Sequence, residues 1–348
     1  METQERSKML GTMEMGKLVP KVSIPIMISM LVQALYNVVD GIFVAKYSAA
    51  ALTAVSLAYP IQMLMIAVST GLGVGFNSLI SRKLGEKRAE EARDAAKNGM
   101  FTELCGYALF LVFGLLFAKP FFNLFTDDLE LQTLGGEYLS IVCIFSFGLF
   151  FGICFERMMQ ATGNTVLSMV TQLTGAVINI ILDPIMIFGL LGFPAMGVAG
   201  AAIATVIGQI GGMTLGLVLN QAKNVELRLH LKGFRPNNTI LKGILDVGFP
   251  SIIMQSISSV MNVLMNMILL GFGATAVNVL GVYFKLQSFV FMPVFGLSNG
   301  LVAILGYNYG ARMRARVYDA LKVALIWAAA IMLLGTLAFL LIPETLLG

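Results

Sequence analysis

The sequence predicts an all-α polytopic membrane protein, from its composition, a series of long apolar stretches and the distribution of its basic residues. Of the 348 residues, 57% are hydrophobic and only 12% are charged, whereas soluble domains have about 25% charged residues. The mean hydropathy is +0.85. A soluble globule must still present a polar surface to water. The composition therefore excludes a soluble enzyme, a disordered protein and a nucleic-acid-binding domain.

Nine apolar stretches are long enough to cross a bilayer as helices, which takes about 20 residues each. They do not alternate in polarity, as the strands of a membrane β-barrel would. Helices are expected because a backbone in lipid must satisfy its own hydrogen bonds. The predicted spans are residues 18–43, 51–80, 99–119, 135–155, 164–190, 196–220, 243–271, 275–305 and 317–342.

The basic residues predict the orientation of these spans. With the N-terminus in the cytoplasm, most of the 23 Lys and Arg residues fall on the cytoplasmic side, among them Arg157 and the clusters in 82–97 and 223–242. Only Lys46 and Lys119 fall on the other side. Such a bias follows the positive-inside rule. We predict a multi-pass protein of a bacterial-type inner membrane with a cytoplasmic N-terminus.

Residues for metal or phosphate chemistry are sparse. The three cysteines lie in apolar segments, and the one histidine is His230; their spacing fits neither a disulfide framework nor a zinc site. The glycines of residues 70–75 lie in mid-span with no lysine after them, which predicts close helix packing rather than a phosphate loop. No Walker motif is present in the sequence. We therefore expect no metal, no organic cofactor and no enzymatic activity.

The sequence repeats itself at a constant offset, which aligns Pro25 with Pro250. A glutamine and several glycines coincide at the same offset without a gap, namely Gln62 with Gln287, Gly71 with Gly296, Gly75 with Gly300 and Gly85 with Gly310. An even number of spans in the first unit gives both units the same orientation, as in transporters with parallel repeats. We predict an N-terminal six-helix lobe over 1–220, a cytoplasmic linker over 221–242 and the first three helices of a C-terminal lobe over 243–348.

The second unit has only three spans where the first has six. We interpret the chain as the C-terminally truncated product of a longer protein, which would transport only with the missing spans supplied. The alternative is a genuine nine-span protein, which a natural stop codon directly after Gly348 would favour.

Polar residues on the first span share one helical face. Gln33, Asn37 and Asp40 are spaced i, i+4 and i+7, with Tyr36 beside them. Ionisable residues inside spans are costly and are usually functional. The alternative for the amides is a hydrogen bond that holds two helices together. For Asp40, burial without a partner favours exchange of a cation.

The fifth span carries a second acid in a similar setting. Asn179 and Asp183 are spaced i, i+4, and Pro184 leaves the carbonyl of Ile180 without its helical partner. These oxygens suit a hard cation, Na⁺ at Asp40, Asn179 and Asp183, or a carboxylate that carries a proton. On the sixth span Thr205 and Gln209 form another i, i+4 pair. Because we expect two acids and no buried base in this lobe, we predict a proton or sodium ion as their partner.

The second unit offers weaker candidates for a substrate cavity. Met254, Met261 and Met265 lie on one face of the seventh span, and methionine adapts to varied apolar ligands. Ordinary packing against lipid or the core is the alternative. Lys285 lies within the eighth span, as an intramembrane charge or with its ammonium reaching the interface.

Four segments of the chain resemble the multidrug and toxic compound extrusion (MATE) family: Ala34–Asp40 (ALYNVVD), Gln160–Asn164 (QATGN), Asn179–Pro184 (NIILDP) and Gly197–Ala202 (GVAGAA). The resemblance covers the whole chain, as one lobe and half of a second. It implies a fold of two six-helix lobes and drug export driven by inward proton or sodium flow. The DinF-like or MepA-like branch is the most similar, since spans 7 to 9 carry no mid-span acid. Its coupling residues match Asp40, Asn179, Asp183 and Thr205.

We therefore predict a monomeric secondary antiporter that exports amphipathic or cationic drugs in exchange for H⁺ or Na⁺. The substrate-cavity candidates are Gln33, Tyr36, Asn37, Gln209, Met261, Met265 and Lys285. One alternative is a lipid-linked saccharide flippase of related architecture, which would need a cationic central cavity. A second is an intramembrane aspartyl protease, whose Gly-x-Gly-Asp signature is missing before Asp183. The residues do not decide between the two ions.

Overall fold

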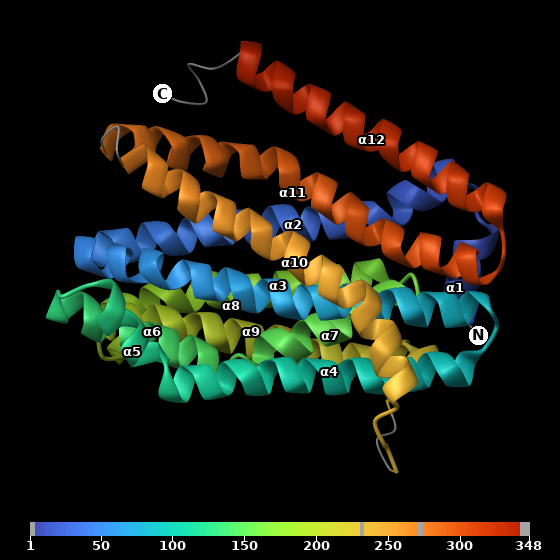
Figure 1. The fold of residues 1–348 in the computed structure, drawn as a ribbon, viewed down its shortest axis with the longest axis horizontal. Coiled ribbons are helices and arrows are strands. Elements are labelled where there is room, and N and C mark those ends of the chain that lie inside the picture. Colours follow the sequence, from blue (N-terminus) through green and yellow to red (C-terminus); the bar gives the residue numbers. More distant parts are fainter. Residues whose placement is uncertain (1–3, 230–232, 271–273, 342–348) are drawn as a thin grey trace.

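The structure is a computed structural model that describes residues 4–229, 233–270 and 274–341. These residues form helices joined by short turns, with no strand among them (Figure 1). The helices are α1 (Gln4–Thr12), α2 (Met15–Tyr47), α3 (Ala49–Gly85), α4 (Ala89–Leu116), α5 (Ala118–Phe125), α6 (Leu129–Ile144), α7 (Phe147–Ala161), α8 (Thr165–Phe188), η1 (Leu190–Gly192), α9 (Gly197–Lys223), η2 (Val225–Leu227), α10 (Asn238–Leu270), α11 (Ala274–Gly310) and α12 (Arg314–Leu341).

The predicted spans correspond to helices of the structure. Eight helices in the described part are long and apolar enough to cross a membrane, and the bent pair α6 and α7 makes a ninth if it counts as one span. This pair is bent by 42°, where the sequence predicted one continuous span over 135–155. The break has a local cause, since the Ser146 hydroxyl donates to the Cys143 carbonyl at 2.8 Å and the Ser146 amide bonds the same oxygen at 3.3 Å.

The repeat is present in the backbone. Helices α3 and α11 both have 37 residues, α4 and α12 both have 28, and the starts of each pair are related by the offset that lays Pro25 on Pro250. The turn after each long helix holds one non-glycine residue with positive φ, Lys87 at 60° and Arg312 at 59°. These two residues are equivalent in the repeat. The predicted repeat is therefore confirmed, down to a strained position in the turn.

The two units meet across matched glycines of α3 and α11. A Cβ atom on Gly85 would collide with the carbonyl oxygen of Tyr307, and a Cβ on Gly310 would collide with that of Arg82. Arg82 and Tyr307 are themselves equivalent positions of the repeat. The contact is therefore made twice by equivalent atoms, as a pseudo-twofold axis requires, and only glycine allows so close an approach.

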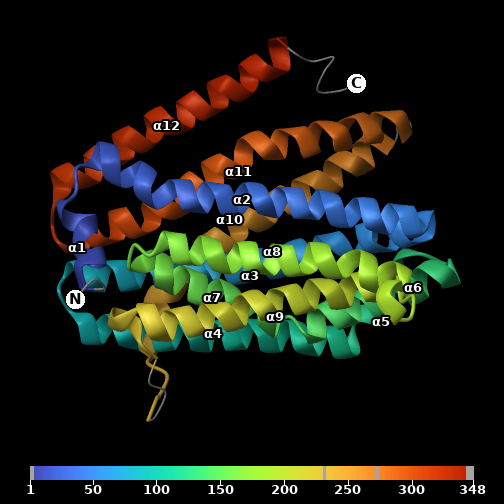
Figure 2. The same ribbon diagram turned by 180° about the vertical axis from the view of Figure 1, so that it is seen from behind.

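Close contacts between the units lie in the half of α3 and α11 nearest α1. Gly71 and Gly75 pack against α10, and Gly296 and Gly300 pack against α2. Towards the other end the ribbons of α10 to α12 diverge from α2 and α3, as seen from both sides (Figures 1 and 2). The units are therefore joined at one end, which we call the α1 end, and apart at the other.

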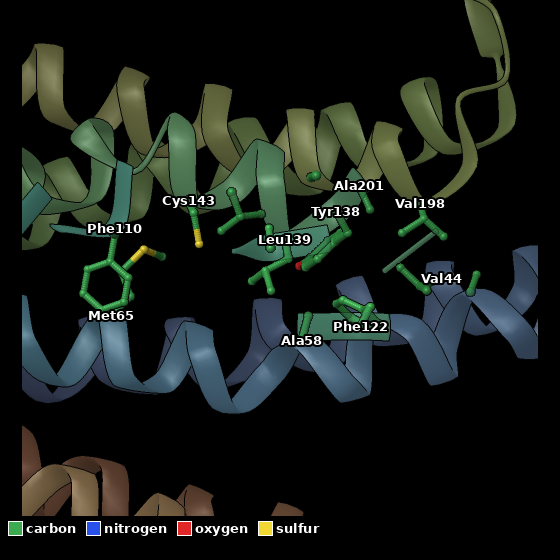
Figure 3. Close-up of a cluster of buried hydrophobic side chains, with 14 of the residues drawn as sticks. Val44, Ala58, Met65, Phe110, Phe122, Tyr138, Leu139, Cys143, Val198 and Ala201 are labelled. Atoms are coloured by element: carbon green, nitrogen blue, oxygen red, sulfur yellow. The ribbon is translucent and has the colours of Figure 1, made fainter. Parts of the chain in front are cut away.

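The first unit has a dense core away from the α1 end. Buried side chains from all the helices α2 to α9 meet there, among them Phe110 of α4, Phe122 of α5, Tyr138 of α6 and Val198 of α9 (Figure 3). Burial of this apolar area stabilises the bundle by about 25 cal/mol per Å² relative to water. The core fixes α6 and α9 against α2 and α3, which positions the polar side chains described next.

Candidate functional site

Two acids face each other inside the first unit. Asp40 of α2 and Asp183 of α8 are neighbours, and their carboxyl groups lie close enough to interact electrostatically. Asp183 is fully buried. Oδ1 of Asp40 and Oδ2 of Asp183 are buried without a hydrogen-bond partner. Two carboxylates that both carry charge repel each other at short range, and a proton or a cation between them would relieve this repulsion.

An amide and a hydroxyl complete the cluster. The Asn179 Nδ2 group donates to Oδ1 of Asp183 at 3.1 Å and to Oγ1 of Thr205 at 3.4 Å. Oδ1 of Asn179 is buried and unpartnered. Thr205 comes close enough because α8 and α9 touch through glycines: a Cβ on Gly208 would lie 2.7 Å from the Gly175 carbonyl oxygen. Three unpartnered acidic or amide oxygens thus lie in one cluster, a donor set that suits a proton or a hard cation.

The other polar candidates of the first unit are Gln33, Tyr36, Asn37 and Gln209, and their surroundings differ. Gln33 accepts a hydrogen bond from Gln172 Nε2 at 2.8 Å, which is the helix-to-helix contact given above as the alternative. Asn37 is exposed. Tyr36 lies near both acids, since each acts electrostatically on its phenol. Gln209 of α9 has a buried Oε1 with no hydrogen-bond partner.

The second-unit candidates lie outside this cluster. Met261 and Met265 are on α10, with exposed fractions of 51% and 39%. Lys285 is in α11, and its side chain lies outside the described part of the structure. The structure therefore assembles Asp40, Asn179, Asp183 and Thr205, but it does not bring the two methionines to them.

The prediction that the first lobe holds no buried base was wrong. Arg157 of α7 is only 4% exposed. Its Nη1 donates to Gln160 Oε1 at 2.9 Å, and Gln160 Nε2 donates to Ser168 at 2.9 Å. The guanidinium is enclosed because α3 presents Gly73 to it, where a Cβ would lie 2.9 Å from Arg157 Cγ.

Two further acids were missed in the sequence. Glu103 of α4 is fully buried and accepts from the Ser69 hydroxyl at 2.8 Å. Glu156 of α7 neighbours Arg157 and acts electrostatically on Tyr36. Arg157 interacts with both acids, so its charge is offset by them. The signal was present, because Glu103 lies inside a predicted span and intramembrane acids are rare.

These features define a class of protein. Two repeats of membrane helices, joined at one end around a glycine contact and enclosing buried carboxylates, have the architecture of a secondary transporter with parallel repeats.

Comparison with known proteins gives the family. The MatE family model matches residues 25–185 and 250–348, so the chain belongs to the MatE family of multidrug and toxic compound extrusion transporters. The two matches begin at Pro25 and Pro250, in agreement with the repeat. The all-α MATE-type fold is confirmed, as is the prediction that the chain is a transporter and not an enzyme.

Individual relatives agree with this assignment. The chain is 27% identical over 310 residues to the multidrug export protein MepA of Staphylococcus haemolyticus, a match that covers 89% of this chain and 68% of that protein. An outward-facing MATE transporter of the MOP superfamily superposes with a TM-score of 0.92 at 28% identity, over 99% of this chain and 76% of that one. A MOP superfamily transporter from Pyrococcus furiosus gives 0.89 at 27%, over 99% and 75%.

Proposed function

We propose that this protein exports amphipathic or cationic drugs in exchange for H⁺ or Na⁺. The observation that carries the proposal is the neighbouring pair Asp40 and Asp183, each of which has one buried carboxyl oxygen without a hydrogen-bond partner. The name of the Staphylococcus relative, a multidrug export protein, supports drugs as the cargo. Its monomeric state and its independence of a resident cofactor are part of the proposal.

The acid pair couples the two fluxes through charge. While both carboxylates are ionised, they attract a cationic drug and repel each other. When a proton or Na⁺ binds between them, this repulsion ends and α2 and α8 pack more closely, which lowers the affinity for the drug. A ligand can shift such an equilibrium only by its difference in affinity for the two states. Asn179 and Thr205 hold the cation with neutral oxygens.

We place the α1 end in the cytoplasm of a bacterial inner membrane. The basic clusters of residues 82–97 and 312–316 lie in or beside the turns at this end, where the positive-inside rule puts them. With the units joined at the α1 end and apart at the other, the described conformation faces outward. The high similarity to an outward-facing MATE structure supports this reading. The flippase alternative depends on Lys285 and remains a prediction.

Dye efflux from inverted vesicles tests the proposal. Vesicles that contain the full chain would be given a pH step in one series and a sodium gradient in another, with ethidium fluorescence as the readout. We expect Asp40→Asn and Asp183→Asn each to abolish gradient-driven dye transport without loss of folded protein. Glu137→Gln is the matched control, because Glu137 is an exposed acid in α6. Transport retained by both acid variants would contradict the proposal.

A further inference from the structure

Helix α1 contacts both units of the molecule at the end where they meet. Towards the first unit, the Ser7 hydroxyl donates to Glu226 Oε1 at 2.6 Å. Glu226 is in η2, and its backbone carbonyl accepts from Arg93 Nε of α4 at 3.0 Å. The N-terminal helix is therefore tied through η2 to the body of the first unit.

Towards the second unit, the carbonyls at the C-terminal end of α1 are bound by two side chains. Asn308 Nδ2 of α11 donates to the Leu10 carbonyl at 2.9 Å. Arg316 Nη2 of α12 donates to the Met13 carbonyl at 2.7 Å and to the Leu10 carbonyl at 3.3 Å. These carbonyls have no partner within the helix itself, so a cation and an amide are well suited to them. Leu10 is fully buried, so this contact is shielded from solvent.

The repeat shows that these two side chains have a specialised role. Positions 83 and 91 of the first unit correspond to 308 and 316 of the second. In the first unit Lys83 and Glu91 form an ion pair at 2.6 Å. In the second unit Arg316 Nε donates to Asn308 Oδ1 at 2.8 Å, Asn308 Nδ2 donates to the carbonyls of Leu10 and of Ile304 in its own helix, and Arg316 Nη2 donates to the carbonyls at the end of α1. The two equivalent positions thus bind each other in the first unit, whereas in the second unit they bind each other and also the end of α1.

We propose that α1 is a latch that holds the two units together at the α1 end. The glycine contact beneath it, between Gly85 and Gly310, can separate only after one side of α1 is released. Release from Arg316 and Asn308 frees the second unit, and release from Glu226 frees the first. The inference rests on the proposed function in one respect, since separation at this end would expose the drug path to the cytoplasm.

Hydrogen exchange of the full chain in lipid nanodiscs tests the latch without any transport assay. In Arg316→Gln, we expect amides in 78–86 and 304–312, which form the glycine contact, to exchange about tenfold faster, the scale of a lost charged hydrogen bond. Ser7→Ala removes the opposite tie and should speed the same peptides by a smaller factor. Arg314→Gln is the matched control, because Arg314 is an exposed arginine at the start of α12.

The outcomes separate the latch from its alternatives. Faster exchange confined to residues 4–13 in both Arg316→Gln and Ser7→Ala would overturn the proposal, because α1 would then loosen without loosening the junction. An equal effect of Arg314→Gln would overturn it as well. If Asp40→Asn and Asp183→Asn kept dye efflux, the proposed function would be contradicted, but the hydrogen-exchange result would not change. The two proposals can therefore fail independently.

Discussion

The helices that the two units share, α2 to α4 and α10 to α12, have matching lengths and different chemistry. Helices α2 and α10 both have 33 residues, yet the repeat equates Tyr36 and Asp40 with Met261 and Met265. In the first unit, α6 to α9 cover α2 to α4 and enclose the acid pair. In the second unit, α12 is mostly exposed, with only 6% of its most apolar window buried. The units thus share the arrangement of their first three long helices and differ in the residues at equivalent positions.

The largest effect is expected where the repeats differ in charge. Asp40→Met gives the first unit the residue of the second, which removes the acid but keeps a side chain that fills space. We expect gradient-driven dye efflux to fall to the background of empty vesicles. Met265→Leu, the control in the other unit, should retain efflux because the thioether carries no charge. Efflux above background in Asp40→Met would mean that the two units share the coupling role.

The glycine contact gives a prediction on stability that is the same for both units. Gly85→Ala and Gly310→Ala each place a methyl group against a carbonyl oxygen of the other unit. Overpacking of this kind costs about 1–3 kcal/mol, and the pseudo-twofold axis predicts equal losses in thermal unfolding. Gly16→Ala is the control, with nothing within 4 Å of its added Cβ. A large difference between the two junction variants would contradict the symmetric contact.

The hydroxyl of Thr205 should have a smaller effect than the acids. Thr205→Val keeps the shape of the side chain but removes the oxygen that accepts from Asn179. We expect the cation concentration for half-maximal dye efflux to rise about tenfold, the scale of one hydrogen bond to a charged cluster. Thr205→Ser restores the oxygen and should be near wild type. If Thr205→Ser behaved like Thr205→Val, packing and not the hydroxyl would be responsible.

The smallest expected effect is that of pH on thermal stability, through Glu226 at the α1 end. Burial raises the pKa of Glu226, and Ser7, Lys8 and Arg93 offset the rise in part; Tyr307 is also near. Because the folded-state pKa lies above the unfolded one, the stabilisation from this group is complete at low pH and is lost as pH rises through the folded pKa. We expect the melting temperature of the wild type to fall slightly over that range, and Glu226→Gln to remove this dependence. An unchanged slope in Glu226→Gln would assign the dependence to another group.

The sequence predicted the spans, the repeat and the residues of the acid cluster. Composition was sufficient to predict the spans, and the spacing of prolines and glycines was sufficient to predict the repeat. Both can be found along the sequence without knowledge of how the helices pack. Helical spacing placed Asn179 and Asp183 on one face. It could not place Asp40 opposite them, since the pairing of α2 with α8 depends on how the whole bundle packs.

The errors have a common cause. Arg157 lies just beyond a predicted span, where a basic residue is normally solvated, and only the close approach of Gly73 explains its burial. The bend at Ser146 depends on one hydroxyl that bonds a local carbonyl. The α1 contacts join residues from opposite ends of the chain. Each of these features depends on a specific contact that no periodic pattern encodes.

Proton release on drug binding tests the coupling role of the acid pair most directly. The purified full chain would be titrated with ethidium in weakly buffered solution, with and without Na⁺, while released protons are recorded. We expect the wild type to release protons in the absence of Na⁺ if H⁺ is the coupling ion, or to bind the dye more weakly as Na⁺ rises if Na⁺ is. Asp40→Asn and Asp183→Asn should show neither response. The same response in both variants as in the wild type would contradict a cation held between Asp40 and Asp183.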